Sequence, residues 1–140
     1  MAAAIGVRNT RQLGDAAKIQ KVRIPVAAGV KIYAGTATVV RAGYLRPATA
    51  TAGDISAGMA CATYDNTAGA AGAVIGEVER GTFGLSNGAG ADEITQAHVF
   101  QLAYFLDDQS VSSVATARSA AGRIMQLENG QVFVELGTTA

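Results

Sequence analysis

The chain has 140 residues, a length that fits one domain with a buried core. It carries 11 basic and 11 acidic residues, and this zero net charge argues against nucleic-acid binding through a basic surface. It also contains 29 Ala and 17 Gly, so larger apolar side chains are few and we expect partners to add to its stability.

The single cysteine, Cys61, rules out an intrachain disulfide. It lies in the apolar run Met59–Thr63, which predicts a small buried side chain on a strand. No apolar run approaches the roughly 18 residues that span a bilayer, and the first residues lack the pattern of a secretory signal. We therefore expect no membrane contact, synthesis in a cytoplasm, and a final place there or in an assembled particle.

Residues 1–18 show neither helical nor strand periodicity, and glycines interrupt any helix. This pattern predicts an extended N-terminal arm ahead of a single β domain over residues 19–140. A disordered tail is the alternative. Two basic residues of the arm, Arg8 and Arg11, are candidate protein-interaction residues.

Regular alternation begins with the stretch Lys21–Val26, which predicts a half-buried strand. Pro25 cannot donate a ladder hydrogen bond, so this strand is expected at a sheet edge. Further strands are predicted over residues 30–33, 38–44, 59–64 and 73–79. They are separated by a loop over 46–54, a turn over 54–58, and a small-residue loop over 65–72 that has no large side chain to anchor it.

The second half continues with short strands predicted over residues 82–85, 101–106 and 110–114. One helical turn is expected over residues 94–99, capped by Asp92 or Thr95. Many short strands with turn signals at intervals near ten residues predict an all-β fold. We expect a small β-barrel or sandwich with at most one short helix and the extended N-terminal arm.

The strongest local signal is Asn129-Gly130, which stands between alternating runs over residues 122–128 and 131–136. Asn-Gly in this setting predicts a two-residue type I′ hairpin turn. The turn pairs Leu127 with Val132, and unbroken alternation then pairs Met125 with Val134.

That register leaves two apolar residues, Ile124 and Phe133, on the polar face of the hairpin. They are candidate protein-interaction residues. Two interpretations stay open, a contact between subunits and a small second core under the arm.

The stretch Gly84–Gly88 matches the G-x-S-x-G pattern of a hydrolase nucleophile, with Ser86 at its centre. That pattern requires a helix after the serine, whereas turn residues follow here. Asp92 and His98 lie too close together in sequence to complete a triad. We therefore expect no catalytic residues, and a serine hydrolase is the weakest functional reading.

Metal and cofactor sites are not expected either. His98 is the only histidine, so zinc has no cluster of ligands. The turn Asp107-Asp108 lacks the spacing of a calcium loop, and the glycines of residues 81–90 lack the Gly-Lys ending of a phosphate-binding loop.

A series of short motifs follows in a fixed order through the second half of the chain, namely Ile75–Val78, Gly81–Phe83, Asp92–Val99, Tyr104–Val111, Ala121–Ile124 and Val132–Glu135. By the order of these motifs, the segment from Gly76 to Leu136 resembles the small capsid cement or head decoration proteins of tailed bacteriophages. Residues 48–59 resemble a linker of such proteins. The chain departs from the family pattern in its long loop over residues 66–72.

The resemblance implies a structural virion protein, made in the host cytoplasm and located on the capsid surface. It implies binding to the major capsid protein, and self-association as a trimer or dimer. The alternative is a particle-displayed module that binds a carbohydrate or a receptor. That reading ranks lower because sugar platforms use exposed aromatics, and this chain has no Trp and only 6% aromatic residues.

Overall fold

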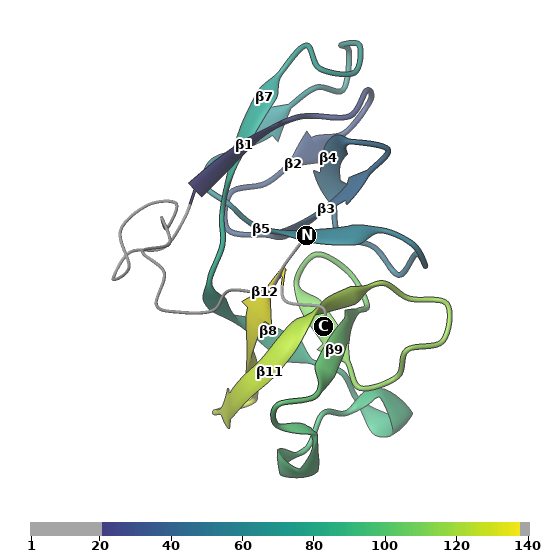
Figure 1. Ribbon diagram of the computed structural model, residues 1–140, viewed down its shortest axis with the longest axis vertical. Coiled ribbons are helices and arrows are strands. Elements are labelled where there is room, and N and C mark those ends of the chain that lie inside the picture. The colour runs from purple at the N-terminus through teal and green to yellow at the C-terminus, as the bar shows by residue number, and fades with distance from the viewer. Residues whose placement is uncertain (1–20, 138–140) are drawn as a thin grey trace, which may run out of the picture.

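The computed structural model describes residues 21–137, which form an all-β fold as predicted, with two 3-10 turns and no longer helix among them (Figure 1). The predicted N-terminal arm and its two residues Arg8 and Arg11 lie outside the described residues. The strands of the first half are β1 (Lys21–Pro25), β2 (Lys31–Ile32), β3 (Ala37–Arg41), β4 (Tyr44–Pro47), β5 (Ile55–Ala60), β6 (Tyr64–Asp65) and β7 (Ile75–Glu79).

The second half supplies a separate group of elements, which lies in the lower part of the view in Figure 1. In chain order these are β8 (Thr82–Asn87), η1 (Gly90–Asp92), η2 (Gln96–His98), β9 (Leu102–Phe105), β10 (Ser110–Ser112), β11 (Ala120–Glu128) and β12 (Gln131–Leu136). The helical turn predicted over residues 94–99 is η2, and Thr95 is its N-cap residue.

Each half has its own sheet. The first half forms a five-stranded sheet in the order β1-β7-β5-β3-β4, beside the small pair β2-β6. The second half closes into a five-stranded barrel in the order β10-β8-β12-β11-β9. Strand β1 lies at the edge of its sheet, which confirms the expectation drawn from Pro25.

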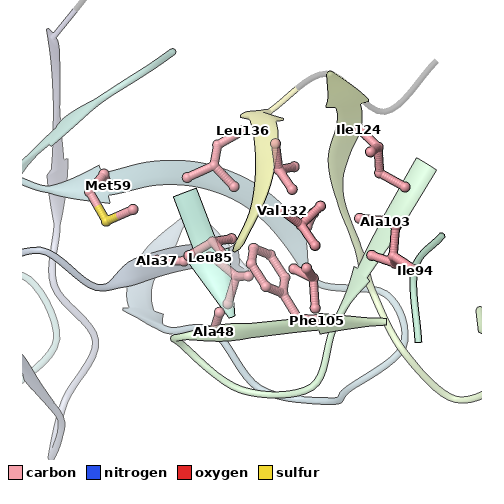
Figure 2. Packing of buried hydrophobic residues seen from close by; sticks show 14 residues of the cluster. Ala37, Ala48, Met59, Leu85, Ile94, Ala103, Phe105, Ile124, Val132 and Leu136 are labelled. Carbon is pink, nitrogen blue, oxygen red and sulfur yellow. The ribbon is translucent and has the colours of Figure 1, made fainter. Parts of the chain in front are cut away.

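Two clusters of buried apolar side chains stabilise these sheets. The smaller cluster lies within the first half, around Val26, Leu45 and Val78. The larger cluster fills the barrel around Phe105 and also takes in side chains of the first half (Figure 2). Those first-half members are Ala37, Val39, Ala48 and Met59. The barrel core is therefore completed by residues of β3 and β5 and of the segment after β4.

The single strand predicted over residues 38–44 is wrong, because the structure has a hairpin there. β3 and β4 pair across the two-residue turn Ala42-Gly43, whose φ angles are +53° and +86°. Positive φ at both central positions is the type I′ geometry. The next strand, β5, begins at Ile55 inside the predicted turn and ends at Ala60, so Cys61 lies just beyond it and is exposed rather than buried.

The loop over residues 65–72 is anchored, contrary to the prediction. The side chain of Asn66 is buried, and its Nδ2 donates to the carbonyl oxygens of Ala27 and Ala70, each at 2.9 Å. A third, longer bond of 3.4 Å reaches the Val26 carbonyl. One amide thus ties the loop to the chain after β1.

The terminal hairpin has the predicted turn, with φ of +51° at Asn129 and +79° at Gly130. Leu127 pairs with Val132 as expected. The register then shifts by one residue between Ile124 and Gln126, so Ile124 and not Met125 stands opposite Val134. A β-bulge of this kind reverses the facing of every residue beyond it.

Candidate protein interface

The bulge changes the position of the first predicted interface residue. Ile124 is fully buried in the barrel cluster (Figure 2), and it stands opposite Val134 in the register of β11 and β12. Its assignment to the polar face of the hairpin is therefore wrong. A fully buried side chain makes no contact with a partner unless the barrel opens.

Phe133, the second predicted residue, does lie on the outer face of β12, because its neighbours Val132 and Val134 are buried inside the barrel. It is half-buried by its own chain. A Cβ placed on Gly84 of β8 would meet the Phe133 ring at 3.3 Å, so the ring lies across this glycine. Phe133 therefore covers the part of the barrel surface where Gly84 has no side chain. Its contact with another subunit stays a prediction.

Four large apolar residues among those described are at least half exposed, namely Tyr33, Ile55, Ile75 and Phe100. Isolated apolar side chains on a surface are ordinary and need no special explanation. Tyr33 also has a partner, because the Lys31 ammonium lies 5.1 Å from its ring centroid.

Phe100 differs from the other three in its backbone. Its φ is +70°, in the left-handed region that bulky residues avoid. Its N–H donates to the Ile124 carbonyl at 2.7 Å, and its own carbonyl accepts from Arg123 Nη1 at 2.7 Å. Strand β11 thus binds both the backbone N–H and the backbone carbonyl of Phe100, while 62% of the residue stays exposed. No sequence pattern points to Phe100, because contacts with residues more than 20 positions away hold its backbone.

A polar cluster fixes the loop between β10 and β11 at the side of the barrel. Arg118 Nη1 donates to the Asp92 carboxylate at 2.8 Å, to Ser112 Oγ at 3.0 Å and to the Val114 carbonyl at 3.1 Å. Ser112 Oγ also donates to Asp92 at 2.8 Å. The Ser112 hydroxyl and the Arg118 guanidinium lower the pKa of Asp92 below its ordinary value.

This cluster also bears on the hydrolase pattern. Asp92 is engaged by Arg118 and Ser112, and His98 Nδ1 accepts the Thr95 backbone N–H at 2.9 Å. Ser86 lies on β8 in the barrel wall, and no hydrogen bond among the described residues joins it to Asp92 or His98. The three residues of the weak hydrolase reading therefore form no triad in this structure.

The remaining titratable groups form no shared centre. Within residues 21–137, no three His, Cys, Asp or Glu side chains gather closely enough to hold a metal ion. Partial burial and the Glu77 carboxylate raise the pKa of the exposed Cys61 thiol. Burial and the neighbouring Asp107 raise the pKa of Asp108.

In the same described range, no helix has the length and apolar character needed to cross a membrane. Comparison with protein-family models, with curated proteins and with solved structures gives no match.

Proposed function

We propose that this chain is a structural virion protein that decorates the mature capsid of a tailed bacteriophage and stabilises it by binding the major capsid protein. The observation that carries the proposal is the order of the motifs between Ile75 and Glu135, which follows that of capsid cement proteins. No enzymatic activity is part of the proposal.

The arrangement of those motifs supports a binding role. Most of them belong to the strands of one closed barrel, β8 to β12, so the resemblance covers a spatial unit. A closed barrel leaves no free strand edges for unspecific pairing. Hydrogen bonds to this barrel hold the backbone of Phe100, and Phe133 lies on one of its strands, β12.

Binding would stabilise the capsid by mass action. A ligand that binds the expanded, mature shell and not its immature form lowers the free energy of the mature state alone. Self-association as a trimer or dimer would add contacts with neighbouring capsid subunits, because linked sites bind more tightly than separate ones. The near-zero net charge permits such close assembly without strong repulsion.

The experiment is sedimentation of the full chain with empty shells built from the major capsid protein encoded in the same genome. We expect the chain to sediment with mature shells, to saturate at a fixed ratio, and to raise their melting temperature. Immature shells and an unrelated phage's shells are the controls. A chain that stays in the supernatant with every shell contradicts the proposal.

A further inference from the structure

Strand β9 has apolar side chains on both of its faces. Ala103 and Phe105 are fully buried in the barrel core, so strand alternation places Leu102 and Tyr104 on the outer face. These two residues are half-buried and are not members of either hydrophobic cluster. A strand that is apolar on both faces is typical of one that is covered on both sides.

Phe100 adjoins this outer face. Arg123 stands opposite Leu102 in the β9–β11 register, and the same arginine donates to the Phe100 carbonyl. The exposed residues near Phe100 in the chain, Ala97 and Gln101, are uncharged, and the charged group on this face is the Arg123 guanidinium that is bonded to the Phe100 carbonyl. Phe100, Leu102 and Tyr104 are hereafter called the β9 face.

Folding alone gives no reason for a phenylalanine at position 100. Its left-handed backbone disfavours a bulky residue, and a glycine or asparagine would adopt the same φ of +70° with less strain. Its ring belongs to neither hydrophobic cluster, and at 62% exposure the residue leaves apolar surface in water. Strain held in place by surrounding contacts is a feature of functional sites.

We propose that the β9 face is the surface by which this chain docks on the capsid shell, with the Phe100 ring inserted into an uncharged apolar pocket of the major capsid protein. The inference rests on the proposed function and names the surface that performs it. Two hydrogen bonds with β11 already hold the Phe100 backbone, so the backbone loses little conformational freedom on binding, which suits the residue to the role of an anchor.

The small size of the β9 face favours a capsid shell, rather than a second free copy of this chain, as its binding partner. An aromatic side chain buries roughly 150–250 Å² when fully covered, so three partly exposed residues offer at most a few hundred Å². A stable pair of free proteins needs about 800 Å² on each partner. A shell supplies further contacts around the same anchor, whereas two free copies joined by this face alone would separate.

The test compares full-length variants in the sedimentation assay with mature shells. Phe100→Gly removes the ring and suits the backbone, so we expect binding to weaken at least about tenfold while the urea midpoint stays level or rises. Phe100→Asn is a second variant that tolerates the left-handed conformation, and it should behave in the same way. Phe100→Tyr keeps an aromatic ring and should retain binding within about threefold. Ile75→Thr removes an exposed apolar side chain from β7, which belongs to the other sheet, and is the matched control, with unchanged binding expected.

The outcomes separate this inference from the proposed function. If the unmodified chain binds no shell, the proposed function fails and the docking surface fails with it. If the unmodified chain binds but Phe100→Gly binds within about twofold as well, the function stands and the β9 face is wrong. If Phe100→Gly lowers the mass of the free protein in light scattering, the occupant is a second copy and the docking inference is overturned.

Discussion

At the scale of single residues, buried polar groups hold the segments that the apolar core does not reach. The loop between β6 and β7 consists of small residues, yet it is tied down because Asn66 turns its amide inward. Among the described residues its amide is the only donor to the Ala27 carbonyl, whereas the Val26 and Ala70 carbonyls also accept the backbone N–H groups of Gly72 and Ala73. Sequence patterns did not reveal this anchor, since asparagine is most often an exposed turn residue and only the tertiary contacts show its direction.

Replacing Asn66 with Ala should lower the free energy of unfolding by about 1–3 kcal/mol, because the buried Ala27 carbonyl loses its donor and the loop loses its amide link to Ala70. Urea unfolding followed by circular dichroism measures the change. Thr67→Ala is the control, since within residues 21–137 this exposed side chain bonds only with the nearby Asp65 carboxylate. Equal midpoints for the Asn66 variant and the unmodified protein would mean that the loop does not depend on this amide.

A second residue-scale prediction concerns pH. The folded state lowers the pKa of Asp92 through Ser112 and Arg118, so the ionised carboxylate stabilises the fold above the unfolded pKa of about 4. This contribution is lost as the pH falls through the folded pKa, below about pH 4. Asp92→Asn should therefore lower the urea midpoint at pH 7, and its difference from the unmodified protein should shrink on acidification.

Glu93→Gln removes the adjacent exposed carboxylate, whose side chain makes no bond within residues 21–137, and serves as the control. It should leave the midpoint at pH 7 nearly unchanged. A constant difference between Asp92→Asn and the unmodified protein from pH 7 to pH 2.5 would show that the carboxylate charge is not what holds the loop.

At the scale of elements, the turns decide how far the strands could be predicted. The hairpin at Asn129-Gly130 was predictable because both residues favour positive φ. The equivalent turn at Ala42-Gly43 was not, because alanine gives no sign of a left-handed position. The bulge at Met125 also left no trace in the sequence, and one extra residue was enough to move Ile124 from the polar face to the core.

The turn at Ala42 can therefore be improved. Alanine at φ of +53° is strained, whereas asparagine tolerates this conformation and completes an Asn-Gly turn. Ala42→Asn should raise the free energy of unfolding by roughly 0.5–1 kcal/mol, measured by urea unfolding. Ala50→Asn, on an exposed loop where φ is not positive, should have almost no effect. A decrease in stability for Ala42→Asn would contradict the type I′ assignment of this turn.

At the scale of the whole molecule, the two sheets are joined by core packing and by polar contacts. Met59 and Ala37 of the first half belong to the same cluster as Phe105 of the barrel (Figure 2). The Gly137 N–H donates to Ser56 Oγ at 3.1 Å, and Arg80 Nη1 donates to the Ala57 carbonyl at 3.0 Å. These links favour one cooperative unit over two independent ones. The single domain over residues 19–140 stays a prediction.

The last prediction follows from this shared core. The fragment of residues 82–140 contains every strand of the closed barrel but lacks Ala37, Val39, Ala48 and Met59, which complete its core. Without them the fragment exposes the apolar side chains that they cover, and a chain of about 60 residues has little stability to lose. We expect a poorly dispersed amide NMR spectrum for this fragment, and one urea transition for the full chain whether it is followed by circular dichroism or by tyrosine fluorescence.

Mixing the fragment with residues 1–81 should restore dispersion, because the missing side chains then return. A fragment that is well dispersed and melts cooperatively by itself would show instead that the barrel is an independent domain, with the first half attached to it as a second one.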